Sequence, residues 1–319
     1  MGAMVVLATE SIDDVVIPVS DAGIWVVNAF LALVVFGVAI DLDLNELRAT
    51  LRSPKGPAIG MVGQLLLLPA ATLGLTLVIQ PPPSVALGMM IVAAAPGGAV
   101  SNFITHLGNG NASLSIGMTG LSTMAAIVMT PLNISFWTQL NPDTKALFSE
   151  GIRVDPLEMV LSIVVLLGLP VGLGVMTQVR RPALARRLRR PARILSIAII
   201  VVFIAFATAA NLGKAEAFFS AVGAIGAGVV LHNAVGLSVG YGLARATRMS
   251  IRDRRAVSVE VGMQNAALAL GLVLSFFENL GGAAVVCAIY GVWHTVSGLG
   301  LAGFWRWRDA RRVAAEVTA

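Results

Sequence analysis

The sequence predicts an all-α polytopic membrane protein with nine transmembrane helices, on three observations. Of the 319 residues, 57% are hydrophobic and only 12% are charged, whereas a soluble domain has roughly 25% charged residues. The apolar residues form runs of roughly 18 to 27, which as helices can cross the hydrocarbon core of a bilayer, about 30 Å thick. Lys and Arg gather in alternate gaps between these runs, as they do in cytoplasmic loops.

The nine apolar runs follow one another along the whole chain, with turn residues in several of the gaps. The breaks Arg52–Gly56, Pro81–Pro83 and Gly108–Asn111 contain the Pro, Gly and Asn residues that end helices. We expect the spans near 23–41, 57–80, 84–106, 112–138, 157–179, 192–212, 217–244, 255–277 and 282–305.

The charge distribution predicts how the chain crosses the membrane. Nineteen of the 22 Lys and Arg residues follow span one, five, seven or nine, and these positions share one side of the membrane if the count is right. By the positive-inside rule that side is cytoplasmic. We therefore expect a multi-pass protein of the cell (inner) membrane, with its N-terminus outside and a cytoplasmic tail at 306–319. A count wrong by one span would place a basic gap on the opposite side.

Two charged segments add to this topology. The first 22 residues contain four acidic residues and no Lys or Arg, whereas a signal peptide begins with basic residues. We expect a short, uncleaved N-terminus outside the cell. The basic group Arg180 to Arg193 is expected to anchor the topology and to touch anionic lipid.

The composition also excludes several classes of function. The net charge of +5 would suit nucleic-acid binding only on a water-facing surface, but these charges lie between apolar runs, so we expect no nucleic-acid partner. Cys287 is the single cysteine, which excludes a disulfide or a multi-cysteine metal site within one chain.

One acidic residue, Glu260, lies well inside an expected span. A charged side chain at membrane depth costs at least a few kcal/mol and is a functional candidate by default. Gln264 follows four residues later, so it shares a helix face with Glu260. The alternative is that Glu260 lies near the cytoplasmic end of its span and pairs with Arg254 or Arg255.

The third span is interrupted by Pro96, Gly97 and Gly98, followed by the polar residues Ser101 and Asn102. Proline removes a backbone donor and glycine loosens a helix. Irregular backbone at membrane depth is tolerated only where it is buried in protein or lines a watery cavity. A bound cation would satisfy the freed carbonyls, whereas a simple packing kink is the alternative.

The interrupted spans three and eight occupy corresponding positions in two halves of the chain, 23–138 and 157–305. Such a pair indicates the binding site of a transporter built from inverted repeats. We therefore expect residues 1–319 to form a single transmembrane transporter domain that couples a cation to an organic solute by alternating access.

Three stretches are specific in combination: Pro96–Gly98 followed by Ser101 and Asn102, then Glu260–Asn265, then Trp293–Gly298. With them, and over nearly its whole length, the chain resembles the bile acid:sodium symporter family, in particular its nine-span members. The resemblance implies two crossed, discontinuous helices, a core domain and a panel domain. It also implies two sodium ions moved together with an organic anion such as a bile acid or a small carboxylate, without an organic cofactor.

The resemblance also implies site residues, carried over by position. The first sodium ion would be bound by Ser101, Asn102, Thr119 and Glu260, with Ser115 beside them. The second would be bound by Gln64, Gln264 and backbone oxygens around Glu260, Val261 and Met263. Hydroxyl, amide, carboxylate and carbonyl oxygens are suitable ligands for a hard cation. The substrate would lie near Gly98, Ala99, Asn102, Asn265, His294 and Thr295.

Three further polar residues inside the expected spans are functional or structural candidates. Asn28 in the first span is a candidate for facing the cavity, but an Asn bonded to a neighbouring helix is an equal alternative. His232 and Asn233 are interpreted as structural residues of a buried span.

Other functions remain as alternatives. Glu260 could carry a proton, although one proton needs one acceptor and not a group of neutral oxygens. An intramembrane enzyme would use Glu260 with a histidine, but no metalloprotease, serine-nucleophile or phosphate-loop motif is present, so we expect no enzyme. A channel would need rings of repeated residues. Membrane lipid and an organic anion are the expected partners. The sequence does not determine the oligomeric state, for which a monomer is one option.

Overall fold

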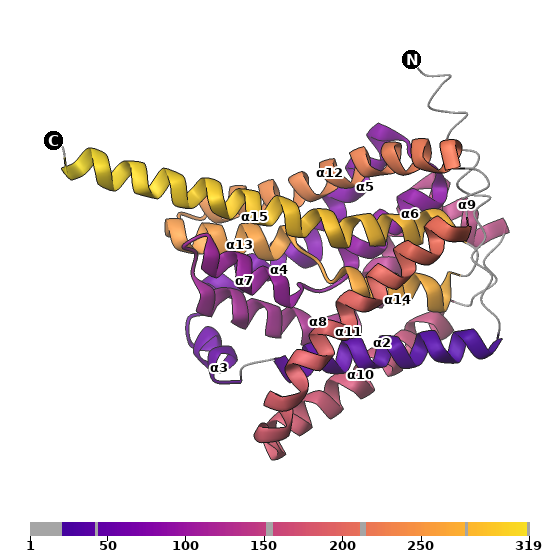
Figure 1. Cartoon of the computed structure of the whole chain (residues 1–319), viewed down its shortest axis with the longest axis horizontal. Coiled ribbons are helices and arrows are strands. Elements are labelled where there is room, and N and C mark those ends of the chain that lie inside the picture. The colour runs from indigo at the N-terminus through magenta and orange to yellow at the C-terminus, as the bar shows by residue number, and fades with distance from the viewer. Residues whose placement is uncertain (1–20, 42–43, 151–155, 211–214, 278–279, 318–319) are drawn as a thin grey trace.

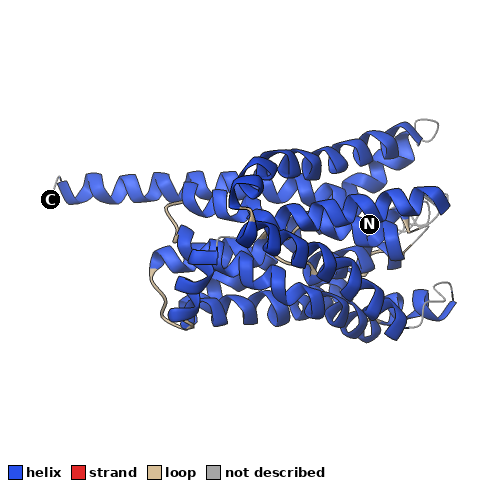
Figure 2. Ribbon diagram, turned by 90° about the horizontal axis from the view of Figure 1, so that it is seen from below, coloured by secondary structure: helices blue, strands red, loops and turns tan. Residues whose placement is uncertain are grey.

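The computed structural model describes residues 21–41, 44–150, 156–210, 215–277 and 280–317. Within these residues the chain is helical and contains no strand, as Figure 2 shows. The all-α prediction is confirmed for this part of the chain. The expected extracytoplasmic N-terminus falls on residues 1–20, outside the described residues.

Each expected span corresponds to a helix or a pair of helices (Figure 1). In chain order they are α2 (Asp21–Asp41); α4 (Lys55–Val62), continued by the π-helical turn η1 (Gly63–Leu67) and α5 (Leu68–Ile79); α6 (Pro83–Ala94) with α7 (Ala99–Leu107); α8 (Ala112–Leu140); α10 (Pro156–Arg180); α11 (Pro182–Ala210); α12 (Ala215–Ala246); α13 (Ile251–Gly262) with α14 (Ala266–Phe276); and α15 (Gly281–Val317). Two short helices in the gaps, α3 (Leu44–Arg52) and α9 (Pro142–Glu150), were not expected from the sequence.

Several helices have the length and composition of membrane spans. Five described segments are long and apolar enough to cross a bilayer: Lys55–Ile79, Ala112–Leu140, Val160–Arg180, Val222–Ala246 and Gly281–Arg312. Three further apolar helices are shorter: Asn28–Ile40, Pro83–Ala94 and Ala266–Phe276. These helices support a multi-pass membrane protein, while the count of nine spans stays a prediction.

The π-helical turn η1 is explained by the proline that follows it. Pro69 has no backbone N–H, so it cannot donate to the carbonyl of Leu65, four residues earlier. The side-chain amide of Asn133 in α8 donates to that carbonyl instead, at 3.0 Å. Irregular turns of this kind are frequent at functional sites, and this one contains Gln64.

The half-length helices α6 and α14 lie in the interior of the molecule. All residues of α6 from Ser84 to Ala94 are buried, as are residues Ala266 to Val273 of α14. Gly88 of α6 lies against the backbone of Ala283 in α15, and an added Cβ would be only 2.7 Å from the Cα of Ala283. The apolar core therefore encloses the ends at which the two interrupted spans are broken.

Helices α2, α10 and α11 pack against one another along one side of the molecule (Figure 1). Helices α8 and α14 connect this group to the remaining helices, because α10 packs on α8 and α2 packs on α14. Helix α15 continues to Val317, twelve residues beyond the expected end of the last span. Its C-terminal end projects past the other helices in Figures 1 and 2.

An ion pair explains part of this extension. Asp309 of α15 accepts two hydrogen bonds from Arg255 of α13, from Nη1 to Oδ2 at 2.6 Å and from Nη2 to Oδ1 at 2.5 Å. Arg255 is only 2% exposed, stacks over the ring of Trp305, and also donates to the carbonyl of Gly108. One buried guanidinium thus joins α13, α15 and the turn between α7 and α8.

The alternative pairing of Glu260 with Arg254 or Arg255 is wrong. Arg255 pairs with Asp309, and Nε of Arg254 donates to the carbonyl of Met249 at 2.7 Å. Both arginines are therefore bonded near the N-terminal end of α13, whereas Glu260 lies near its C-terminal end.

We predict that Asp309→Asn destabilises the protein by about 1 to 3 kcal/mol, because the buried Arg255 loses its charged partner. Thermal unfolding of the purified protein in detergent measures this change. Asp143→Asn, at an exposed position of α9, is the control and should unfold like the parent protein. Equal unfolding temperatures for both variants would contradict a structural role for the ion pair.

Candidate functional site

The two interruptions meet in the interior of the molecule. Gly97, between α6 and α7, forms an isolated antiparallel bridge with Gln264, between α13 and α14. The N–H of Gly98 donates to the carbonyl of Met263 at 3.2 Å, and the N–H of Asn265 donates to the carbonyl of Pro96 at 2.8 Å. The backbone that each interrupted helix leaves unpaired is thus bonded partly to the other. We call this region the crossover.

Glu260 lies beside the crossover at the end of α13 and is 0% exposed. Its carboxylate accepts hydrogen bonds from Ser101 Oγ at 2.8 Å and from Thr119 Oγ1 at 2.9 and 3.0 Å, and Ser115 Oγ lies at 3.5 Å. The side-chain oxygen of Asn102 accepts from Ser115 and Thr119 at 2.9 and 3.1 Å. The first predicted set of ligands, Ser101, Asn102, Ser115, Thr119 and Glu260, is therefore one hydrogen-bonded cluster.

This oxygen cluster contains more acceptors than hydrogens. The Thr119 hydroxyl has a single hydrogen, yet four acceptor oxygens lie 2.9 to 3.1 Å from it: both carboxylate oxygens of Glu260, Oδ1 of Asn102 and the carbonyl of Ser115. The Ser101 hydroxyl likewise lies 2.8 Å from both Glu260 Oε2 and the carbonyl of Gly98. A buried group of oxygens that are not fully paired favours a positive charge among them.

The predicted second set of ligands also lies beside Gly97. Nε2 of Gln64 donates to Oε1 of Gln264 at 2.9 Å, and Nε2 of Gln264 donates to the carbonyl of Val261 at 2.8 Å. Oε1 of Gln64 is buried without a hydrogen-bond partner. Buried amide oxygens are normally paired, so this atom is available to a ligand.

Gly97 is a site residue that the sequence interpretation did not assign. A Cβ at this position would overlap Oε1 of Glu260 and lie 3.4 Å from Nε2 of Gln64. Its N–H donates to Ser122 Oγ of α8 at 3.3 Å. Gly97 therefore leaves the space in which Glu260 and Gln64 approach the crossover. The Pro-Gly-Gly sequence indicated a break, but not which glycine touches the carboxylate.

A second group of residues holds the C-terminal end of α13. The side-chain amide of Asn233 and the hydroxyl of Tyr290 both donate to the carbonyl of Gly262, at 2.6 and 2.8 Å. Ser297 donates in turn to Oδ1 of Asn233 at 2.6 Å. His232, next to Asn233, bonds through Nε2 to Thr72 Oγ1 at 2.9 Å. These contacts agree with the structural interpretation of His232 and Asn233, whereas Tyr290 was not foreseen.

The predicted substrate residues are only partly brought together. Gly98 and Asn265 face each other across the crossover, because a Cβ at Gly98 would lie 3.7 Å from the Cα of Asn265. His294 is buried, and its ring lies 5.3 Å from that of Tyr290. Thr295 donates to the carbonyl of Gly291 in its own helix, and Asn28 is half-buried on α2. None of the hydrogen bonds described for the chain connects Thr295 or Asn28 to the crossover. Ala99 begins α7, but its side chain lies outside the described residues.

Comparison with known protein families shows to which family the chain belongs. Residues 28–218, well over half of the chain, match the Sodium Bile acid symporter family. The chain belongs to this family. The resemblance inferred from the crossover motifs is thereby confirmed for the family.

Three relatives illustrate the range of the symporter family. The "Uncharacterized sodium-dependent transporter YocS" of Bacillus subtilis is 29% identical over 293 residues, which are 92% of this chain and 87% of the relative. The "Probable sodium/metabolite cotransporter BASS1, chloroplastic" of Arabidopsis thaliana is 30% identical over 276 residues, 86% of this chain and 65% of the relative. The "Ileal sodium/bile acid cotransporter" of Cricetulus griseus is 28% identical over 252 residues, 79% of this chain and 70% of the relative. The chain thus spans slightly less than two thirds of the plant relative.

We predict that Gly97→Ala destabilises the protein by about 1 to 3 kcal/mol, because the added methyl group overpacks the carboxylate of Glu260. Gly98→Ala is the matched control: its Cβ would meet the carbonyl of Gln264 at 3.5 Å, an ordinary van der Waals contact. Thermal unfolding in detergent measures both. A Gly97→Ala protein as stable as Gly98→Ala would show that the crossover has room for a side chain.

Proposed function

We propose that the chain is a sodium-coupled symporter that moves an organic anion across the membrane by alternating access. The observation that supports this most directly is Glu260, a fully buried carboxylate in an oxygen cluster at the crossover. The relatives named above are sodium-dependent transporters or cotransporters by name, which favours transport over an intramembrane enzyme.

Two sodium ions are assigned to the two groups of oxygens. The first ion binds to Ser101, Asn102, Thr119 and Glu260, with Ser115 beside them. The second binds to Gln64, Gln264 and carbonyls around Glu260, Val261 and Met263. The surplus of acceptors around Thr119 and the unpaired Oε1 of Gln64 support these assignments. Oxygen ligands of this kind suit a hard cation.

Proton coupling through Glu260 is the second candidate function. It would need a single acceptor, and a proton placed on Glu260 would itself supply a missing hydrogen to the cluster. A proton on Glu260 would leave Oε1 of Gln64 without a hydrogen-bond partner. That oxygen has no partner in the structure and lies in a group of amides and carbonyls. We therefore favour sodium.

The organic anion is expected beside the crossover, where two helices begin. Helices α7 and α14 both start there, and the N-terminal end of a helix carries partial positive charge and free N–H groups. No side chain caps the first turn of α7, whereas Asn265 caps α14 by accepting from the N–H of Leu268. A carboxylate bound at the start of α7, near Gly98 and Asn102, would receive these N–H groups.

In the proposed cycle, sodium binds first and offsets the charge of Glu260. The ions then hold the residues of α7, α8 and α13 in a fixed arrangement around the crossover, which raises the affinity for the anion. Thermodynamic reciprocity requires the anion to raise the affinity for sodium by the same factor.

The membrane arrangement completes the proposal. Nine spans would place the N-terminus outside and the C-terminus in the cytoplasm of a cell (inner) membrane. We assign α2, α10 and α11, which pack together, to the panel domain and the helices around the crossover to the core domain. A monomer contains every residue of the two proposed sodium sites.

We predict that sodium chloride stabilises the purified protein in detergent more than potassium or choline chloride does. A ligand that binds only the folded state adds about 2.7 kcal/mol at a hundredfold excess over its dissociation constant. Glu260→Ala should remove the sodium-selective stabilisation and abolish coupled uptake while the protein still inserts. Asp143→Asn is the control and should keep both.

A different result would identify the other candidate. If stability followed pH without a preference for sodium, proton coupling through Glu260 would replace sodium coupling. Full uptake by Glu260→Ala would contradict the assignment of the site itself.

We predict that Gln264→Ala raises the sodium concentration for half-maximal uptake by about tenfold, because the second site loses an oxygen ligand. Gln139→Ala, at an exposed position near the end of α8, is the control. Uptake into proteoliposomes as a function of external sodium measures both. An unchanged titration for Gln264→Ala would contradict the second sodium site.

A further inference from the structure

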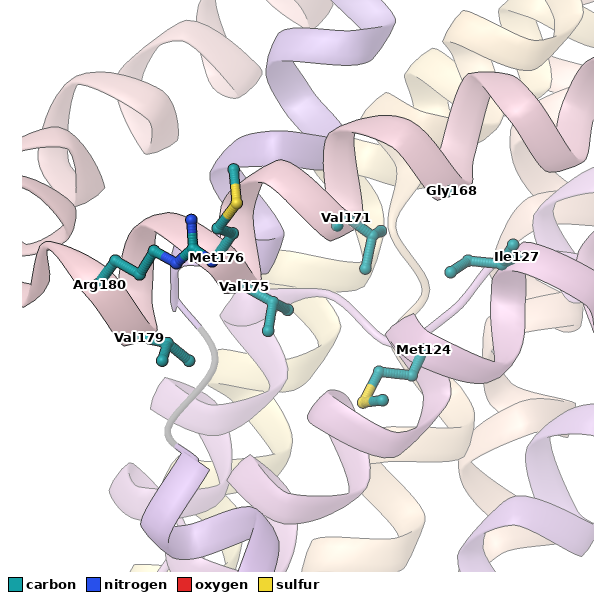
Figure 3. Close-up of a pocket in the computed structure, with 9 residues that line it drawn as sticks. Met124, Ile127, Gly168, Val171, Val175, Met176, Val179 and Arg180 are labelled. Carbon is teal, nitrogen blue, oxygen red and sulfur yellow. The ribbon is translucent and has the colours of Figure 1, made fainter.

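A groove of about 450 Å³ runs between α8 and α10 (Figure 3), and none of its lining residues belongs to the crossover or to the oxygen cluster around Glu260. Met124 and Ile127 of α8 form one wall, and Gly168 and Gly172 of α10 lie on the other. Apart from Arg180 at the end of α10, its lining residues are apolar or glycine. The groove takes no part in the proposed sodium sites.

Two of the α10 residues that line the groove, Gly168 and Gly172, have no side chain to fill it. Gly168 and Gly172 are four residues apart and share one helix face. A Cβ at Gly172 would meet nothing within 4 Å, and one at Gly168 would meet only Ile127, at 3.4 Å. Small residues at this spacing usually allow two helices to pack closely. Here the neighbouring helix does not fill the space.

The surroundings of the groove are those of a lipid-facing surface. Both helices contain segments long and apolar enough to cross a membrane. On α10 the large side chains of Val165 and Leu169 are 65% and 64% exposed. An occupant must therefore be apolar along most of its length, as an acyl chain of the bilayer is.

One end of the groove carries a positive charge. Arg180 is exposed and, in Figure 3, lies at the end opposite Ile127 and Gly168. The twelve steps along the helix from Gly168 to Arg180 correspond to about 18 Å, compared with about 15 Å for one half of the hydrocarbon core. The groove thus has the length of one leaflet, with its cation near the depth of the lipid headgroups. Arg181 and Arg186, also exposed, follow Arg180.

We propose that this groove binds an anionic phospholipid of the leaflet that faces Arg180. One acyl chain lies between α8 and α10 along Gly168 and Gly172, and the phosphate group contacts Arg180. The apolar length of the groove selects a lipid chain, and the arginine at its end selects an anionic headgroup over a zwitterionic one.

The test uses the purified full-length protein in a neutral detergent, titrated with phosphatidylglycerol or with phosphatidylcholine of identical acyl chains. Thermal stabilisation as a function of lipid concentration gives the apparent affinity. We expect phosphatidylglycerol to bind more tightly. Arg180→Gln should lose about fivefold in affinity for phosphatidylglycerol and so remove the preference, whereas Arg245→Gln, in the last turn of α12, should keep it.

Filling the groove tests the position of the acyl chain. Gly172→Leu should weaken the binding of both lipids, and Gly172→Ala should do so to a smaller extent. Gly74→Leu is the matched control, because Gly74 is an exposed glycine of α5 whose Cβ would also meet nothing within 4 Å. Should Gly172→Leu fail to fold, the Gly172→Ala and Arg180→Gln titrations still decide.

Three results would overturn the proposal. The first is equal affinity for the two lipids in the parent protein. The second is phosphatidylglycerol binding that Gly172→Leu and Gly172→Ala leave unchanged. The third is evidence for a different occupant. If cholate competed with the lipid only when sodium is present, the groove would be part of the transport route. If the protein formed a dimer that Gly172→Leu dissociates, the occupant would be a second copy of the chain.

Discussion

The structure depends on one constraint, the burial of the Glu260 carboxylate where water cannot reach it. An isolated charge in such a place is costly, and the protein surrounds it with hydroxyl groups of Ser101, Thr119 and Ser115, taken from two other helices. Those hydroxyls can approach only because α6 and α7 are separated at Gly97, where a side chain would occupy the same space as the carboxylate. The break between α6 and α7 therefore leaves room for the carboxylate that α13 carries.

Local sequence signals predicted much of this arrangement. A proline followed by two glycines disrupts a helix, and a single acid in an apolar run is conspicuous, so the break in the third span and the importance of Glu260 could be predicted from the residues themselves. The other members of the oxygen cluster around Glu260 were implied by the family resemblance. The ion pair between Arg255 and Asp309, the caps that Asn233 and Tyr290 place on Gly262, and the contact of Gly97 with Glu260 could not be predicted. Each depends on a partner far away in the sequence, which periodicity and composition do not reveal.

The groove between α8 and α10 illustrates the same difference between sequence and structure. Gly168 and Gly172 have the spacing of a small-residue face, which usually allows close helix packing. Only the structure shows that the neighbouring helix leaves the space beside Gly172 open. Likewise, the sequence does not distinguish Arg180 from the other arginines of its basic segment. Its position at the end of the groove does.

The two backbone hydrogen bonds at the crossover, Gly98 to Met263 and Asn265 to Pro96, have a mechanical consequence. They join the loops of two helices that are distant in the sequence, and they do not depend on the identity of any side chain. A rearrangement that preserves both bonds keeps the loop between α6 and α7 attached to the loop between α13 and α14. Helices α2, α10 and α11, which pack on one another, take no part in these two bonds, so a shift of that group relative to the crossover would break neither of them.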